Sequence, residues 1–142
     1  SDNILNNGKN YRWWGLYDVQ RKANVKGNGE YVQTNMIWGQ QWDAMLEFLG
    51  TEKANSTISG NQTGVLKSGE ATYNNLKDEM NNIYDLRRNV SEWTAEGNNS
   101  NCRVLRAGFY SNSLSAFTRY AYNLWPYYST PTLGSRLTLY IK

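Results

Sequence analysis

The hydrophobic pattern changes from helical to strand-like along the chain, and this change constrains the fold more than any other feature. Before residue 51, two stretches repeat apolar residues every three or four positions, which is typical of helices that bury one face. The first stripe consists of Trp13, Leu16 and Tyr17, and the polar Gln20 follows at the same spacing. The second consists of Trp38, Trp42, Met45, Leu46 and Leu49, and Gly50 follows where a glycine commonly ends a helix.

After Asn82 the apolar residues come in short pieces separated by turns. The pieces NIYDL, VSEWT, CRVLRAGFY and SRLTLYIK are typical of strands, and the last alternates apolar with polar residues. Early helices and late strands predict an α+β fold with two helices packed on a small twisted antiparallel sheet. We expect Trp42 and Trp93 to be buried. The 142 residues suffice for one domain spanning residues 1–142, with a loop over 51–64 and irregular structure over 65–80.

Several kinds of chemistry are excluded by composition. The chain has one cysteine, Cys102, and no histidine, so it offers no internal disulfide, no His-activated nucleophile and no imidazole metal ligand. We expect Cys102 to be a passive small residue. No apolar run approaches the ~20 residues of a membrane span. Ser1 is not a natural initiator, so we expect a processed or trimmed form.

The C-terminal third draws on a narrow set of amino acids. Residues 97–141 contain no Asp, Glu, Lys, Gln or Met, while Tyr, Ser and Asn are frequent. Apart from Trp125, every residue type present there is encoded by codons that end in a pyrimidine, as randomised Asn codons would give. An edge sheet rich in Tyr, or chance in an Asn/Ser-rich chain, would give the same bias.

Four motifs in order resemble the formylglycine-generating-enzyme (sulfatase-modifying factor) family, which has a C-type-lectin-like fold. The residues of YDLRRNVSEWT resemble its D-x-x-G-N-V-x-E-W signature at Asp85, Asn89, Val90, Glu92 and Trp93. QQWDAM resembles its Glu-Trp-Glu helix, RVLRAGFY its Arg-Val-x-Arg-Gly-Gly-Ser strand, and GSRLTLYI its closing Gly-Phe-Arg strand. The resemblance covers residues 13–142 and implies further sequence upstream.

Departures from this family concern its chemistry. Arg88 and Ala107 stand where the family has glycine, and Ser91 where it often has Trp. The enzyme binds copper through two cysteines near its C-terminal arginine-rich segment, whereas the segment around Arg119 reads AFTRYAYNL. A copper site needs thiolate or imidazole ligands. We therefore expect the fold without the oxidase activity, and a degenerate enzyme of this type is the second alternative.

Calcium-dependent sugar binding is also not indicated. Lectins of this fold use Glu-Pro-Asn or Gln-Pro-Asp triplets, and neither Pro126 nor Pro131 lies in one. We expect no cofactor. A structural calcium ion held by carbonyl, Asn or Asp oxygens is left open by the sequence.

The narrow composition on such a fold resembles the variable proteins of diversity-generating retroelements, in which template adenines are copied with errors. The motifs MIWG, QWDA, NNIYD and LYIK are also similar to proteins of gut Firmicutes bacteria and their phages. The resemblance implies a non-catalytic display protein on a virion tail or bacterial surface, with a protein or cell-surface ligand. Its variable, Tyr/Ser/Asn-rich binding face would occupy about residues 97–133. The first alternative is a non-variable lectin-like adhesion or phage tail receptor-binding module.

The residues that match the family motifs (the anchors) are expected to belong to the structural scaffold, and the residues between them to the binding face. The scaffold residues are Arg103, Val104, Arg106, Gly108, Arg119, Gly134 and Arg136, and Asp85 and Glu92 are expected partners of their guanidiniums. The residues between these anchors form the candidate face: Leu105, Ala107, Phe109, Tyr110, Asn112, Leu114, Phe117, Tyr120, Tyr122, Asn123, Leu124, Tyr127 and Tyr128. We expect Trp125 to pack inside. A net charge of +3 without clustered lysines argues against nucleic acid as the partner.

Overall fold

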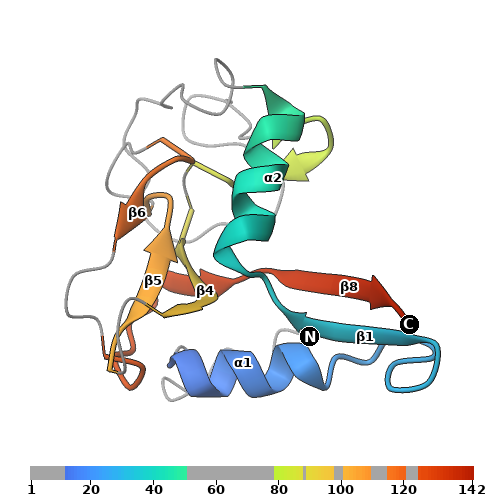
Figure 1. Cartoon of the computed structure of the whole chain (residues 1–142). Helices are drawn as coiled ribbons and strands as arrows, with labels where there is room; N and C mark the ends of the chain where they lie inside the picture. The colour runs from blue at the N-terminus through green and yellow to red at the C-terminus, as the bar shows by residue number, and fades with distance from the viewer. Residues whose placement is uncertain (1–11, 51–78, 88, 98–100, 110–114, 121–124) are drawn as a thin grey trace.

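Both helices come early in the described chain, with one strand between them, and the remaining strands follow (Figure 1). The computed structural model describes residues 12–50, 79–87, 89–97, 101–109, 115–120 and 125–142. Its elements are α1 (Trp13–Arg21), β1 (Val32–Met36), α2 (Gly39–Leu49), β2 (Glu79–Met80), β3 (Ile83–Tyr84), β4 (Ser91–Gly97), β5 (Arg103–Arg106), β6 (Arg119–Tyr120), β7 (Leu133–Ser135) and β8 (Leu137–Ile141). The predicted α+β class with two helices is confirmed in these ranges.

Both helices form where the apolar stripes predict them. Trp13 and Leu16 of α1 are buried, and so are Trp42, Leu46 and Leu49 of α2. Gly50 ends α2 with a φ of 86°, a left-handed conformation that glycine adopts without steric cost. Trp38 was expected in the buried stripe and is exposed instead, because it precedes the helix as its N-cap residue.

The main sheet has four strands in the order β6-β5-β4-β7. β5 is antiparallel to both of its neighbours, but β4 and β7 are parallel, so the expectation of a purely antiparallel sheet is wrong. The parallel pair arises because the chain passes through β5 and β6 before it returns to β4. As an inner strand of this sheet, β5 has neighbours at both edges.

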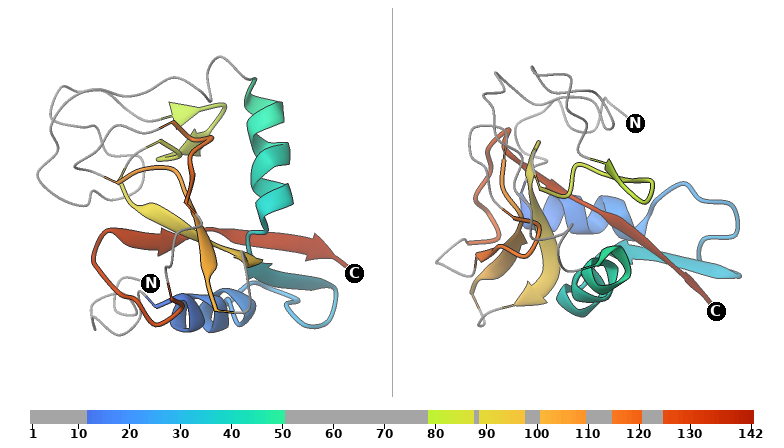
Figure 2. Two further views of the ribbon diagram at one scale, coloured as in Figure 1. Left: turned by 60° about the vertical axis from the view of Figure 1, so that its left-hand side comes forward. Right: turned by 90° about the horizontal axis from the view of Figure 1, so that it is seen from above.

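A separate two-stranded ribbon joins β1 to β8 in antiparallel register, with Thr34 opposite Leu139. Figures 1 and 2 show this ribbon extending from the rest of the fold, with α1 on one side and α2 rising on the other. A β2–β3 hairpin turns at Asn81 and Asn82, whose φ angles of 49° and 62° suit a type I′ turn. Strand structure at Glu79–Met80 was not expected, because 65–80 reads as irregular.

The buried apolar residues form two clusters. One surrounds Trp42 of α2 and includes Leu86 and Ala107, and the other joins Trp13 of α1 to Met36 and Trp93. Trp42 and Trp93 are both fully buried, as predicted. Each helix therefore packs against the strands through a different cluster, α1 through Trp13 and α2 through Trp42.

Candidate functional site

The backbone of the C-terminal segment is attached to the scaffold at several points. One tryptophan of each helix donates a hydrogen bond to this segment. The Trp42 Nε1–H donates to the Ala116 carbonyl at 2.9 Å, and the Trp13 backbone N–H donates to the Pro126 carbonyl at 2.9 Å. Next to β5, the Ala107 N–H donates to the Thr118 carbonyl at 3.0 Å. Ala116 and Pro126 are themselves buried. These contacts fix the path of the segment on either side of the undescribed residues 121–124.

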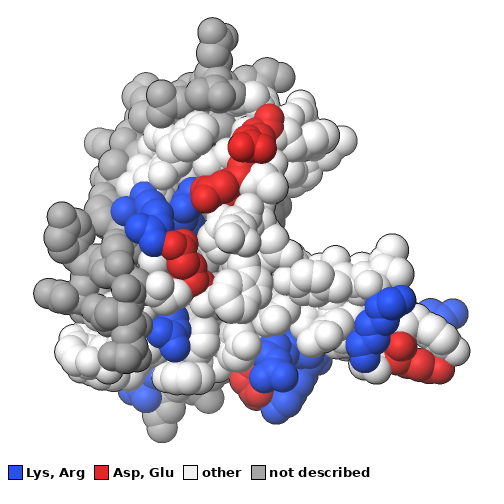
Figure 3. Space-filling model, in the orientation of Figure 1, with Lys and Arg blue, Asp and Glu red and all other residues white. Residues whose placement is uncertain are grey.

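Two anchor arginines pair with carboxylates beside α2. Arg106 is almost fully buried, and its Nη2 lies 2.5 Å from the Asp43 Oδ1. Arg119 on β6 bonds Glu96 on β4 through Nε at 3.1 Å and also through Nη2. The hydrogen bonding that Arg119 donates to the Glu96 carboxylate raises the pKa of the Arg119 guanidinium above its ordinary value. Figure 3 shows basic and acidic side chains gathered on this face, next to α2.

The other two anchor arginines are also engaged within the fold. The Arg136 Nε lies 2.7 Å from the Glu92 Oε2 as an ion pair outside linear hydrogen-bond geometry, and its Nη2 donates to the Tyr84 carbonyl at 2.6 Å. Arg103 stacks its guanidinium over Trp13 at 4.5 Å. The expected role of Glu92 is confirmed, whereas the role of Asp85, which is buried, stays a prediction.

Three candidate face residues are exposed as predicted. The exposed fractions are 41% for Phe117, 61% for Tyr127 and 50% for Tyr128. Trp125 was expected to pack inside and is exposed instead, with its ring stacked on Tyr127 at a centroid distance of 5.8 Å. The buried Pro126 between them holds this turn against α1, so the flanking rings point outward.

Two candidate face residues were expected to be exposed and are buried instead. Leu105 lies on β5 between β4 and β6 and packs in the Trp13 cluster, and Ala107, directly after β5, packs in the Trp42 cluster. They cannot contact a ligand from these positions. Phe109 is half-buried, and Tyr120 lies on β6. The remaining candidates lie outside the described residues: Tyr110, Asn112, Leu114, Tyr122, Asn123 and Leu124.

The exposed candidates occupy two places in the fold. Trp125, Tyr127 and Tyr128 lie beside the start of α1, whereas Phe117 follows Ala116 next to α2. Figure 1 shows the two segments at opposite ends of the β5–β6 pair. Convergence of the whole candidate face on one patch therefore stays a prediction.

Trp14 is an exposed aromatic residue that the sequence reasoning missed. It lies 5.9 Å from the Arg103 guanidinium and forms an edge contact with Trp13, whose backbone bonds Pro126. Its position off the apolar stripe of α1 is the signal that could have found it. Trp14 therefore places a further exposed aromatic ring on α1, one residue after the Trp13 N–H that bonds the Pro126 carbonyl.

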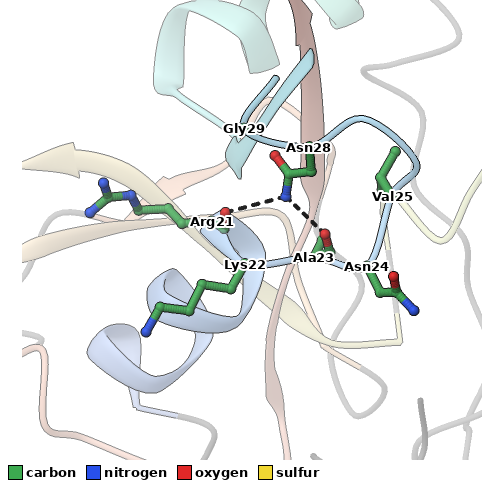
Figure 4. Close-up of a pocket in the computed structure, with 7 residues that line it drawn as sticks. All are labelled: Arg21, Lys22, Ala23, Asn24, Val25, Asn28 and Gly29. Carbon is green, nitrogen blue, oxygen red and sulfur yellow. Dashed lines mark hydrogen bonds between the residues drawn. The ribbon is translucent and has the colours of Figure 1, made fainter. Parts of the chain in front are cut away.

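A hollow of about 460 Å³ lies at the other end of α1 and is lined by Arg21, Lys22, Ala23, Asn24, Val25, Asn28 and Gly29 (Figure 4). The Asn28 side-chain amide donates to the Ala23 carbonyl and the Thr34 hydroxyl, both at 2.8 Å. Its carbonyl accepts from the Thr34 N–H at 3.1 Å. Because these bonds occupy the amide, Asn28 serves to fasten the end of α1 to β1.

No group of three or more His, Cys, Asp or Glu that could hold a metal ion occurs among the described residues. Neither α1 nor α2, the helices of the described ranges, is long and apolar enough to cross a membrane. Comparison of the chain with protein-family models, curated proteins and solved structures found no match.

Proposed function

We propose that this chain is a non-catalytic ligand-binding protein with a C-type-lectin-like fold, whose residues 97–133 present a variable binding face. The observation that carries the proposal is a division of roles within this segment. Its arginine anchors are tied to the scaffold, as Arg106 is to Asp43, while Tyr127 and Tyr128 between anchors point to solvent. Side chains can vary on such a segment without disturbing the contacts that hold its backbone.

The chemistry of the exposed residues favours recognition of varied ligands. Tyr and Trp offer large contact areas that lose little conformational entropy on binding, as they do in antibody loops. Exposed aromatic side chains also reduce solubility, which gives a reason to expect a partner. We infer a protein or a cell-surface molecule as the ligand.

The lone thiol supports a role without catalysis. Cys102 lies next to the start of β5 and is buried, so its thiol is not accessible to a peptide bound at the surface. Copper chemistry of the formylglycine-generating type would need an accessible thiolate pair. We assign the segment around Arg119 to binding instead.

Binding to intact cells tests the proposal. We would label the full chain and measure its binding to a panel of intact gut bacterial cells. The triple variant Phe117→Ser, Tyr127→Ser, Tyr128→Ser should lose binding to every strain that the parent recognises. The matched control is Tyr31→Ser with Phe48→Ser, which removes two exposed aromatic side chains from outside the segment. Loss of binding in the control, or retention in the triple variant, would contradict the proposal.

A further inference from the structure

Among the described residues, no strand pairs with the outer edge of β8. In the described part of the chain, β8 pairs only with β1, and the two form a ribbon with no third strand. An edge strand exposes a row of backbone N–H and C=O groups that can pair with another strand. Proteins usually protect such edges with charges, prolines or bulges. The five residues of β8, LTLYI, contain no charge, proline or glycine.

The backbone groups on this open edge can be identified. At the two ends of the ribbon, the Lys142 N–H donates to the Tyr31 carbonyl and the Arg136 carbonyl accepts from the Ile37 N–H. Even-numbered residues of β8 therefore face β1. Because N–H and C=O of one residue point to the same edge of an antiparallel strand, the groups of the odd-numbered residues face outward. These residues are Leu137, Leu139 and Ile141.

The side chains of the same three residues form an exposed apolar stripe. They lie opposite Met36, Thr34 and Val32 of β1. All six side chains are therefore on the face of the ribbon where α1 packs against β1. The helix leaves β8 uncovered, so Leu139 is 50% exposed and Ile141 87% exposed. α2 contacts the opposite face of the ribbon, where Gln41 donates a hydrogen bond to the Tyr140 hydroxyl at 2.9 Å.

The sequence of β8 is self-complementary about Leu139. In an antiparallel pair of two β8 strands centred there, Leu139 meets its own copy and Leu137 meets Ile141. Each of these opposed pairs exchanges two backbone hydrogen bonds, which uses every outward-facing group of both strands. Thr138 meets Tyr140, so hydroxyl-bearing side chains lie opposite each other on the α2 side.

Charge does not oppose this pairing. Arg136 and Lys142, which flank β8, would meet across the pair, but the Arg136 guanidinium is held by Glu92 and the Lys142 Nζ by the Gly29 carbonyl at 2.6 Å. A strand of unrelated sequence has no reason to match both the apolar and the polar positions of β8. A second copy of this chain matches both.

We propose that the chain forms a two-fold symmetric dimer through antiparallel pairing of β8 with β8 of a second copy. The two ribbons join into one four-stranded sheet in the order β1-β8-β8-β1. The apolar stripes of both copies become contiguous on the face that carries α1. Such an isologous contact closes on itself and produces no fibre.

Sedimentation velocity across a concentration series, with the full chain, tests the proposal. The parent should convert from monomer to dimer as its concentration rises. Leu139→Lys places two ammonium groups together at the two-fold axis and should raise the dimer dissociation constant more than about tenfold. Ile141→Lys should also weaken the dimer, and it tests the same edge if Leu139→Lys fails to fold. Gln33→Lys is the matched control, because it adds the same charge to exposed β1 and should leave the dimer intact.

Hydrogen exchange identifies the edge that is used. The Leu139 amide should exchange slowly in the dimer and rapidly on dilution, whereas the Tyr140 amide, bonded to β1, should stay protected at both concentrations. A parent that stays monomeric at the highest concentration would overturn the proposal. A dimer that Leu139→Lys and Ile141→Lys do not weaken would also overturn it. So would a dimer in which the exchange rate of the Leu139 amide does not change on dilution.

Discussion

Arg119 on β6 and Glu96 on β4 form an ion pair that spans the intervening strand β5. Glu96 is the last acidic residue of the chain, and Arg119 lies in the middle of the acid-free segment that follows it. The pair therefore joins the acid-free segment to β4, an inner strand of the main sheet. Gly39 at the start of α2 lies directly against the Glu96 carboxylate.

Gly39→Ala should break this ion pair. A Cβ at position 39 would lie 2.8 Å from the Glu96 Cδ and still closer to Oε2, so the carboxylate must leave the position in which it pairs with Arg119. We expect a loss of about 1 kcal/mol in the free energy of unfolding, the scale of a partly exposed charged pair. Urea denaturation of the single variants and of Gly39→Ala with Glu96→Ala measures the coupling. Additive effects would contradict a mechanism that acts through Glu96.

Trp42→Ala and Trp93→Ala should each lower the free energy of unfolding by about 3–5 kcal/mol, because each removes a fully buried aromatic side chain. Trp42→Ala also leaves the Ala116 carbonyl without its donor. The control Phe48→Ala removes an exposed ring of α2 and should change stability by less than about 0.5 kcal/mol. Equal losses in all three variants would contradict the assigned core.

Leu105 should behave as a core residue although it lies within the acid-free segment. Leu105→Ala should cost about 2–5 kcal/mol, since the side chain packs with Trp13 and Trp93. The triple variant Phe117→Ser, Tyr127→Ser, Tyr128→Ser should hardly move the melting temperature, because these rings are exposed. Thermal melts followed by circular dichroism separate the two cases. Unfolding of the triple variant would show that its rings support the fold.

The chain should lack formylglycine-generating activity. Its one cysteine is buried and it has no histidine, so it offers no pair of soft ligands for copper. Incubation with copper and a sulfatase-type peptide should leave the peptide cysteine unchanged by mass spectrometry. Appearance of the aldehyde product would disprove the non-catalytic assignment.

The helices could be predicted from the sequence because their signals are local. Trp13 and Leu16 repeat at helical spacing, and Gly50 marks the end of α2. β1 was missed, although Val32, Thr34 and Met36 alternate with polar residues, because five residues between a turn and a helix give a weak pattern. The parallel β4–β7 pair joins segments about 40 residues apart, and no local sequence pattern in either segment indicates such a pairing.

The candidate face could be predicted only in part, because composition does not give direction. A narrow set of amino acids marks the segment but does not tell an inner strand from a turn. Leu105 was therefore grouped with Tyr127, although one lies in β5 between two strands and the other follows a buried proline. The helix-borne Trp14 lies outside the segment, so its composition could not reveal it.

Sequencing the DNA beside the gene tests the central claim, that a fixed scaffold carries a diversified face. We predict a near-copy of the codons for residues 97–140 next to a reverse-transcriptase gene, with differences at adenines. Those differences should fall at exposed positions such as Phe117, Tyr127 and Tyr128, and should spare the anchors Arg106 and Arg119. The absence of any copy, or differences spread equally over anchors and exposed positions, would contradict the account.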